Sequence, residues 1–514
     1  MFPNSSRHAG LAALALVSSL LAACGGANDP VVTGAAATPG PAGGTTGSTG
    51  TTTPAGQAAP AATPVAATLV PTLVGRAVLA ADSFVAGPTS GQYITGGDLT
   101  KSASYGYRLP FVGKQPIQGF SAVADGPLPG CYYAMQDNGF GGKGASPDAL
   151  LHVYAVRMDW TAGKVLPADF ATCAPQASFD SNTFIRLRDP DRKLGFALVA
   201  DAASYPGTTS DTGAVVPVDP LIRSQRLLTG GDIDIESLVI DADGNFWFGE
   251  EFGPFLVKTD RTGKVLQKET ALINGLSPAA NPLVQSPNNP YLGAGVANLP
   301  GSGGIESLAI NPARTRIYTL LERELSTDTD KRRRLMNVFD IKTNAFLPTT
   351  HAYRVDTGAY VNELGATVAE VYTVNDITAI NDHEFLVMEK DRGAGDARLG
   401  VFPAAGASRV AARFKKVFRV DLNVVDADGF LVKTEVVNLM ALVDPALVGG
   451  DATLQRLFTF PMESVETVHI VDSTTLLVAN DNNYPGGAGS RDPARVDNNE
   501  FVLIRLPVAL NLQR

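Results

Sequence analysis

The stretch ESLVIDADGNFWFGEE, from Glu236 to Glu251, places carboxylates at both ends of two apolar runs that are joined by a turn. In an antiparallel hairpin the first residue of one strand lies beside the last residue of the next. We therefore expect Glu236 to lie close to Glu250 or Glu251. Like charges brought together in this way raise one another's pKa and oppose folding unless a cation or a basic side chain balances them. The hairpin thus predicts a site for something positive.

Other segments repeat this order of acid, strand, turn, strand and acid. They are ESLAINPARTRIYTLLE from Glu306, DITAINDHEFLVMEKD from Asp376, ETVHIVDSTTLLVAND from Glu466 and, as a looser copy, FSAVADGPLPGCYYAMQDN from Phe120. If the hairpins are equivalent elements of one architecture, their acids converge on one rim. The pattern predicts a ring of metal ligands formed by Glu236, Glu251, Glu306, Glu322, Asp376, Glu389, Glu466 and Asp481.

The ligand types of this ring indicate which cation it would hold. Oxygen ligands without a cluster of His or Cys favour Ca²⁺ over Mg²⁺ or Mn²⁺. Further oxygen ligands at similar strand ends are Asp137, Asn138, Asn480, Asn482 and Asn483. The alternative for any one of these acids is structural, since acids at strand ends also bind backbone N–H groups or pair with arginine.

Basic residues follow the acids directly and are candidates for substrate contacts: Arg323, Lys390, Arg392 and Arg491. Arginine holds phosphate through two parallel hydrogen bonds. A ring of carboxylates that binds cations beside such residues suits a small anionic substrate, such as a phosphate ester.

Motifs for other kinds of catalysis are weak. The stretch GFSAV at Gly119 lacks the last glycine of a serine-hydrolase elbow, and no H-E-x-x-H or C-x-x-C motif occurs. The chain has five histidines, and we expect His469 and the others of the folded body to be ordinary strand or turn residues.

The elements that must position the acids are short strands rich in Val, Ile, Phe and Tyr, separated by turn clusters such as DADGN. This pattern predicts an all-β protein, and the recurring hairpins favour a β-propeller of about six blades. A two-sheet sandwich or two smaller β domains are the alternatives. Residues 274–303 form a long insertion that we expect to be a loop or lid over one face.

The N-terminus predicts export and lipidation. Residues 1–23 have the layout of a signal peptide, and LAAC before Gly25 has the form of a bacterial lipobox, so we expect cleavage before Cys24 and a lipid on its thiol. An ordinary signal peptide is the alternative. Residues 24–67 are rich in Gly, Ala, Thr and Pro and predict a disordered linker, which leaves residues 68–514 as the folded domain.

Composition and cysteine content limit the compartment and the kinds of partner that we expect for this protein. The formal net charge of −10 and a pI of about 5.1 disfavour a nucleic-acid partner, and we expect a monomer that contacts a membrane through its lipid alone. An oxidising compartment would permit a disulfide between Cys131 and Cys173, with two free thiols as the alternative. We expect the protein in the cell envelope, held at the outer membrane, or secreted.

Several motifs resemble a known family. The runs GGDIDIESLVIDADGNFWFGEEFGPFLVKTDRTGKVL, VNDITAINDHEFLVMEKDRG and VETVHIVDSTTLLVANDNNYP, together with QGFSAV and YYAMQDNGFGGKGASPDALLHVYAV, resemble phytase-like proteins with esterase-like activity. This resemblance extends from about residue 75 to the end. It implies a secreted or periplasmic propeller that hydrolyses phosphate esters with calcium at an acidic axial site.

Two other functions stay open at this point. A hydrolase of carboxylic esters or lactones would use the same ring with an acid or a histidine as the base. A binding lipoprotein without enzyme activity would need the acids for structure alone. Fold does not decide between these functions.

Overall fold

The structure is a computed structural model that describes residues 70–301, 303–362, 365–400, 410–487 and 489–514. The chain divides into two units, Met1–Ala66 and Ala67–Arg514, and all described residues belong to the second. The expected signal peptide, the lipidated Cys24 and the whole of the expected linker lie outside the described residues. No described helix is long and apolar enough to cross a membrane.

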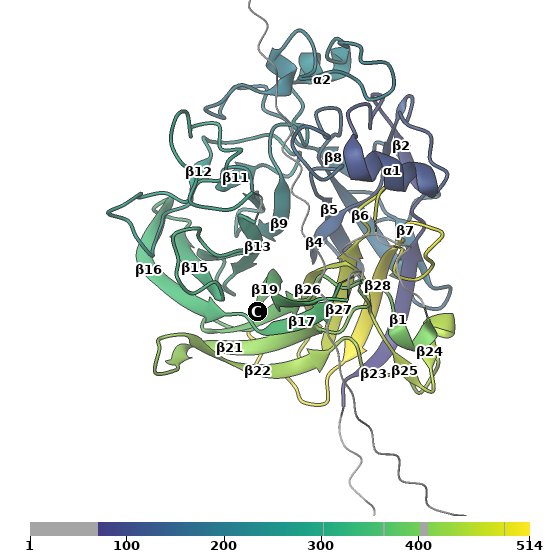
Figure 1. Ribbon diagram of the computed structural model, residues 1–514, viewed down its shortest axis with the longest axis vertical. Helices are drawn as coiled ribbons and strands as arrows, with labels where there is room; N and C mark the ends of the chain where they lie inside the picture. The colour runs from purple at the N-terminus through teal and green to yellow at the C-terminus, as the bar shows by residue number, and fades with distance from the viewer. Residues whose placement is uncertain (1–69, 302, 363–364, 401–409, 488) are drawn as a thin grey trace, which may run out of the picture. The chain divides into compact units, whose positions relative to one another are not determined.

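The described chain is a β-propeller of five four-stranded blades. The inner strand of each blade contacts the inner strands of the two neighbouring blades, so that the five inner strands close a ring. Figure 1 shows this ring, with β4, β9, β13, β19 and β26 around the centre of the view. The all-β propeller is confirmed, and the blades are five where repeat length and chain length indicated about six.

The first four blades are consecutive in sequence, and their strands are given from the axis outward. Blade 1 is β4 (Phe120–Asp125), β5 (Cys131–Gln136), β6 (His152–Asp159) and β7 (Lys164–Pro167), with β8 (Phe184–Arg186) also on β6; blade 2 is β9 (Ile235–Ile240), β10 (Phe246–Glu250), β11 (Phe255–Thr259) and β12 (Thr270–Ala271). Blade 3 is β13 (Ile305–Ile310), β14 (Arg316–Leu321), β15 (Arg333–Asp340) and β16 (Ala345–Arg354); blade 4 is β19 (Thr373–Ala379), β20 (Glu384–Lys390), β21 (Lys415–Val425) and β22 (Leu431–Asn438).

Blade 5 joins the two ends of the folded domain. It consists of β26 (Ser464–Asp472), β27 (Thr475–Asp481), β28 (Asn499–Arg505) and, as its outermost strand, β1 (Thr72–Leu79). The remaining elements are β2 (Phe84–Ala86) paired with β3 (Lys114–Pro116), α1 (Gly96–Ser104), α2 (Pro220–Gln225), the hairpin β17 (Thr357–Val361) and β18 (Thr367–Val371), and the short strands β23 (Leu442–Val443), β24 (Thr453–Leu454) and β25 (Leu457–Phe458). Pairing of the first strand with the last closes the ring of blades.

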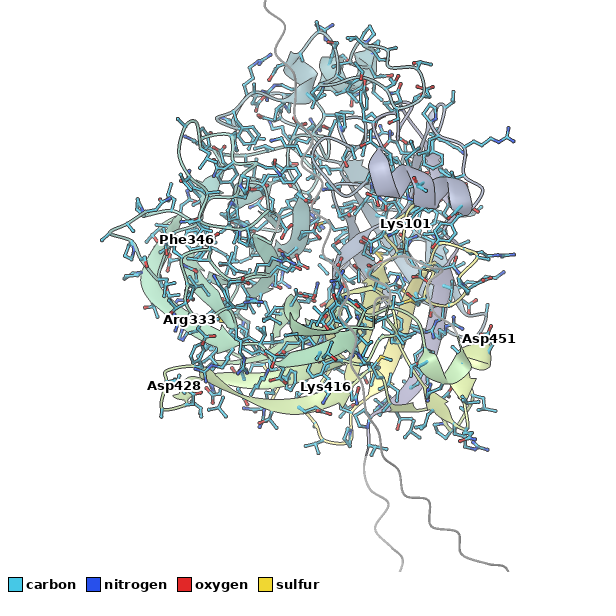
Figure 2. The ribbon with its side chains drawn as sticks, viewed as in Figure 1. Lys101, Arg333, Phe346, Lys416, Asp428 and Asp451 are labelled. Atoms are coloured by element: carbon cyan, nitrogen blue, oxygen red, sulfur yellow. A yellow bond between two sulfur atoms is a disulfide. The ribbon has the colours of Figure 1, made fainter. Side chains whose placement is uncertain are left out.

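Apolar side chains hold each blade to the next. Five buried clusters lie between blades 1 and 2, 2 and 3, 3 and 4, 4 and 5, and 5 and 1. Trp247 of blade 2 and Phe339 of blade 3, for example, have ring centroids 5.2 Å apart. Figure 2 shows side chains filling the spaces between the blades. The core is therefore divided among the blade interfaces, which leaves the axis for polar groups.

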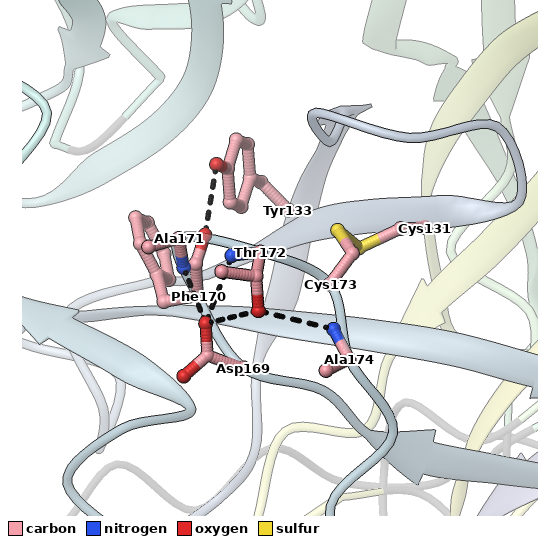
Figure 3. The surroundings of a disulfide bond; sticks show 8 residues. All are labelled: Cys131, Tyr133, Asp169, Phe170, Ala171, Thr172, Cys173 and Ala174. Carbon is pink, nitrogen blue, oxygen red and sulfur yellow. Dashed lines mark hydrogen bonds between the residues drawn. A yellow bond between two sulfur atoms is a disulfide. The ribbon is translucent and has the colours of Figure 1, made fainter.

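A disulfide fixes one loop of blade 1. Cys131 at the start of β5 is bonded to Cys173, a pairing that the sequence leaves open (Figure 3). In the same loop Phe170 stacks on Tyr133 with centroids 4.5 Å apart, and its carbonyl accepts a hydrogen bond of 3.1 Å from the Tyr133 hydroxyl. The covalent link and the stacked rings hold this loop against blade 1.

Candidate active site

A β-bulge recurs at one position in all five blades. The pairing of each inner strand with the second strand shifts by one residue, and the extra residues are Ser121, Glu236, Glu306, Asn375 and Glu466. A bulge leaves one residue unpaired and redirects its side chain. Two hydrogen bonds show that these side chains meet across blades. Asn375 Nδ2 donates to Glu306 Oε1 at 2.8 Å, and Ser121 Oγ donates to Glu466 Oε2 at 3.1 Å.

A second layer of side chains stands at the end of the second strands. On each second strand, one residue pairs with the inner strand just before the bulge, and the next residue along the second strand belongs to this layer. The five residues are Asp137, Glu251, Glu322, Lys390 and Asp481. The backbone N–H groups of Asp137, Glu251 and Glu322 donate to carbonyl groups two residues before the bulges. Gly119 supplies one of these carbonyls with φ +64°, and a Cβ there would lie 2.3 Å from Asp137 Oδ1. A glycine is therefore required beside this acid.

Four acids of the two layers, together with Asp234, form two groups that share one residue. Asp234, Glu236 and Glu251 can bring one oxygen each within 4.8 Å of one another, and so can Glu251, Glu306 and Glu322. Among the described residues, Glu251 Oε1 and Asp234 Oδ1 are buried and have no hydrogen-bond partner. Buried polar atoms almost always have a partner, so these two oxygens need an explanation.

Burial and mutual repulsion raise the pKa values of the acids at the axis. The pKa of Asp234 rises to about 7, and the pKa values of Glu236, Glu251 and Glu306 rise well above the ordinary range. Loss of solvent is the largest cause, and the charges of neighbouring carboxylates add to it in each case. A positive charge placed between the two groups would remove both penalties.

The two groups have the chemistry of a site for a hard divalent cation. Their ligands are carboxylates, which Ca²⁺, Mg²⁺ and Mn²⁺ prefer. Glu251 Oε1 and Asp234 Oδ1 also have no hydrogen-bond partner among the described residues, so both oxygens are available to a cation. The residues present therefore fit such an ion.

Basic residues border the acids on the blade 4 side. Lys390 takes the place in the second layer that an acid has in the other four blades, and its charge interacts with Glu466, Glu322 and Glu306. Within the described chain its ammonium makes no hydrogen bond or close ion pair. A cavity of about 270 Å³ reaches Asp137 and Lys390 of the second layer and is also lined by Arg392, Glu463, Tyr484 and, from α1, Lys101. Figure 2 labels Lys101.

The two predicted arginines near the site, Arg323 and Arg392, stand at its rim. Arg323 is half exposed, and its Nε lies 3.6 Å from Glu322 Oε2. Arg392 lies 5.4 Å from the centroid of the Tyr360 ring, and its backbone N–H donates to Glu370 at 2.7 Å, which ties it to the β17–β18 hairpin. Arg323, Lys390 and Arg392 are thus gathered around one mouth of the axis.

The structure places two predicted metal ligands, Asp376 and Glu389, away from the axis. The carboxylate of Asp376 accepts hydrogen bonds from the N–H groups of Ile377 at 2.8 Å and Val468 at 2.7 Å, because Asn375 is the bulged residue of blade 4. Glu389 binds Tyr353, Lys433 and the N–H of Asp356. Since side chains alternate along a strand, a shift of one residue turns each of these acids away from the axis.

Arg491 and the asparagines also have other partners. Arg491 donates two hydrogen bonds of 3.1 Å to Glu500 on β28. The amides of Asn480, Asn482 and Asn483 bind nearby backbone or side-chain groups, whereas Asn138 donates to the Gly141 carbonyl and also hydrogen-bonds Asp234. Glu250, the other candidate partner of Glu236, accepts from the N–H groups of Phe252 and Gly253. These side chains build the loops around the site.

Sequence reasoning missed Asp234 and Lys101. Asp234 lies two residues before the bulge at Glu236, where blades 1 and 3 have Gly119 and Gly304, so the repeat gives no signal for it. Lys101 belongs to α1, far from the hairpins in sequence. The acid two residues before Glu236 in GGDIDIES is the one visible hint.

Fold and site together define a five-bladed propeller with a carboxylate cluster at one end of its axis. The family model described as Phytase-like, Esterase-like activity of phytase, matches residues 115–484. The chain belongs to this family.

Comparison with individual proteins gives more distant likenesses. An uncharacterized secreted protein of Arthroderma benhamiae is 28% identical over 303 residues, which are 53% of this chain and 57% of that protein, so this chain spans little more than half the length of its relative. Among solved structures, a luciferin-regenerating enzyme is similar at TM-score 0.29 and 10% identity over 78% of this chain and 84% of its own. Regucalcin of Agrobacterium tumefaciens is similar at TM-score 0.30 and 12% identity over 77% and 95%. Such structural likenesses say nothing about activity.

Proposed function

We propose that this chain is an extracytoplasmic hydrolase that cleaves small phosphate esters with Ca²⁺ held in the carboxylate cluster at the axis. The observation that carries the proposal is the pair of acid groups that share Glu251, whose buried Oε1 has no partner among the described residues. Membership of the phytase-like family and the secreted relative support the activity and the location.

The ion would be held by the residues of the two groups, with Glu251 common to both. Asp234 and Glu236 complete one group with Glu251, and Glu306 and Glu322 complete the other. A bound divalent cation supplies Lewis-acid polarisation of a phosphoryl oxygen. Mg²⁺ or Mn²⁺ is the less favoured occupant, because Mg²⁺ demands octahedral geometry and usually keeps several waters.

The basic side chains at this mouth would hold the anionic part of the substrate. Lys390 projects beside the acids without a hydrogen-bond partner in the described chain, while Arg323 and Arg392 stand further out. Ammonium and guanidinium groups form strong, charge-assisted hydrogen bonds with phosphate oxygens. These contacts would orient the ester with its phosphoryl group toward the acids.

Asp137 would accept the proton of the attacking water. Its carboxylate lines the cavity beside Lys390 and is held by the N–H of Gly139 at 2.8 Å. Burial and the charges of Asp481 and Asp234 raise its pKa well above the ordinary range. A carboxylate with a raised pKa is a stronger base and can return the proton to the leaving oxygen.

A carboxylic ester or lactone is the second candidate substrate, since the description of the family itself includes esterase-like activity. The same cavity would hold this ester, and the same acids would act on it. The proposal also retains a lipid on Cys24, a place in the cell envelope, a monomeric state and no nucleic-acid partner.

The test is hydrolysis by the purified protein over matched phosphomonoesters, phosphodiesters, carboxylic esters and lactones, in Ca²⁺ and in chelator. We expect turnover that requires Ca²⁺ and falls below detection in Glu251→Gln. Glu435→Gln, an acid on the exposed strand β22, is the matched control and should keep full activity. Full activity in chelator would contradict the proposal. Metal binding without turnover of any ester would favour a binding protein instead.

A further inference from the structure

Lys415 is a fully buried lysine beside the candidate site. It is the first residue of β21, and its side chain is 0% exposed. In the sheet of blade 4 it pairs with Lys390 of β20, and side chains of directly opposed residues stand on the same face of a sheet. Lysine is almost never fully buried unless its charge is balanced, so its place here needs a reason.

The ammonium of Lys415 is surrounded by oxygen atoms. It donates hydrogen bonds to the backbone carbonyls of Asp391 at 2.6 Å, Gly393 at 2.9 Å and Glu463 at 3.3 Å. An ammonium has three N–H donors, which match these three carbonyls. The carboxylate of Asp391 lies 3.0 Å from the same nitrogen and balances its charge.

The three carbonyls belong to two chain segments that carry residues of the cavity. Asp391 and Gly393 are the neighbours of Arg392 in sequence. Arg392 and Glu463 both line the cavity at the candidate site. The first segment follows β20 of blade 4, and the second precedes β26 of blade 5. Lys415 therefore joins two blades at the mouth where the proposed substrate would bind.

The segment around Arg392 is tightly packed. A Cβ on Gly393 would lie 2.5 Å from the carbonyl oxygen of Ala411. The Arg392 guanidinium donates to the Tyr360 hydroxyl at 3.1 Å, which holds the side chain at its outer end. Without Lys415 the carbonyls on both sides of Arg392 would lose this donor, and buried carbonyls that lose a partner are costly. We expect the segment to shift in response.

We infer that Lys415 is a positioning residue that holds Arg392 where it can contact the anionic group of the substrate. The ion pair of Lys415 with Asp391 carries no net charge, so it acts on an anion through geometry. Misplacement of a binding group by about 1 Å can cost about 100-fold, which is readily measured. The inference rests on the phosphate site of the proposed function, but its test does not require turnover.

The experiment is calorimetric titration of the purified protein with inorganic phosphate in Ca²⁺, together with steady-state kinetics on a phosphomonoester. The variant is Lys415→Met with Asp391→Asn, which leaves neither charge buried alone. We expect phosphate affinity to fall at least about tenfold and KM to rise by a similar factor, with kcat within about twofold. Calcium affinity should not change.

A matched control separates this effect from a general loss of stability. Lys258→Met with Asp241→Asn removes another ion pair, of 3.1 Å, near the turn between β9 and β10. Phosphate affinity and KM should stay unchanged in this control. Melting temperatures identify any variant that fails to fold. Gly393→Ala is the second variant, because its Cβ displaces the same segment while the ion pair of Lys415 remains, and it should also weaken phosphate.

A double-mutant cycle tests whether Lys415 acts through Arg392. Arg392→Gln should weaken phosphate binding, and adding the Lys415 and Asp391 changes to it should weaken binding little further. Full additivity would overturn the inference, and so would unchanged phosphate affinity in the Lys415 variant, an equal loss in the control, or no phosphate binding by the unaltered protein. Phosphate binding that depends on Lys415 without turnover of any ester would contradict the hydrolase and support this inference.

Discussion

Lys390 and Asn375 make blade 4 different from the other blades. At the second-layer position, four blades have an acid and blade 4 has Lys390. At the first-layer position, three blades have glutamate and blade 4 has Asn375. The site is therefore polarised, with the acid groups between blades 2 and 3 and an ammonium on the side of blade 4. Under the proposed function, this asymmetry would separate a place for a cation from a place for an anion.

Lys390→Met tests the anion side. If the ammonium holds the substrate, the loss of a charge-assisted hydrogen bond should lower kcat/KM about 10- to 100-fold. Binding of Ca²⁺ should not weaken, because a positive charge near the acids is removed. Steady-state kinetics and calcium titration check both results, and unchanged kcat/KM would show that Lys390 does not contact substrate.

The raised pKa of Asp234 makes the effect of calcium depend on pH. Burial and neighbouring acids raise this pKa to about 7, so between about pH 4 and pH 7 the folded protein holds a proton that the unfolded chain has lost. Stability without metal should therefore fall as the pH rises through this window. Calcium displaces the proton, so it should raise the melting temperature more at pH 7.5 than at pH 5. An equal shift at both pH values would contradict this account.

Much of the candidate site could be predicted from residues, and the two misplaced acids of blade 4, Asp376 and Glu389, have one cause. The hairpin repeats located Glu236, Glu306, Glu466 and their partners, because the acid and the strand pattern recur together. Blade 4 carries Asn375 at the bulge in place of an acid. The sequence repeat therefore aligns the neighbouring Asp376 with Glu236, Glu306 and Glu466. A bulge is set by backbone pairing, which has no signature in the order of apolar and polar residues.

At the scale of elements, closure of the ring depends on β1 and β28. Arg76 on β1 donates two hydrogen bonds of 2.9 Å to Glu500 on β28, and Arg491 donates two more from the preceding loop. Glu500 is buried, and a lone carboxylate there would be costly. The two arginines therefore fix the strand that joins the ends of the domain.

Glu500→Gln tests this closure. Burial alone would raise the pKa of Glu500, but Arg491 and Arg76 outweigh it and lower the pKa to about 2 from its ordinary 4.5. The stabilisation is present above pH 4.5 and is lost as the pH falls toward 2. The variant should lose about 3 kcal/mol of unfolding free energy at pH 7 and converge with the unaltered protein near pH 2. Denaturant titrations across this range check it, and a constant difference at all pH values would contradict it.

The disulfide permits a second prediction at this scale. It closes a loop of 42 residues, and the loss of entropy from the unfolded chain is worth about 4 kcal/mol. Cys131→Ser with Cys173→Ser should lower the unfolding free energy by about this amount while leaving calcium binding unchanged, because the loop packs on blade 1 away from the acid groups. Weakened calcium binding would show that the loop also positions the site.

For the whole molecule, the sequence predicted the architecture better than the count of blades. Repeated hairpins identify a propeller because each blade buries its faces only against its neighbours. The count was too high because long connections, such as residues 187–234 and 274–303, occupy length that blades would otherwise fill. The closing strand β1 follows the linker and pairs with β28, more than 400 residues away, which no local pattern indicates.

The measurement that tests the central claim most directly is hydrolysis of a phosphomonoester panel by the unaltered protein and by Glu251→Gln, with calcium binding measured on the same samples. The account predicts turnover that depends on calcium, with both turnover and calcium affinity lost when the shared carboxylate is removed. Calcium affinity should fall by more than about tenfold, since Glu251 belongs to both acid groups. Undiminished turnover in Glu251→Gln, or in the unaltered protein without calcium, would contradict it.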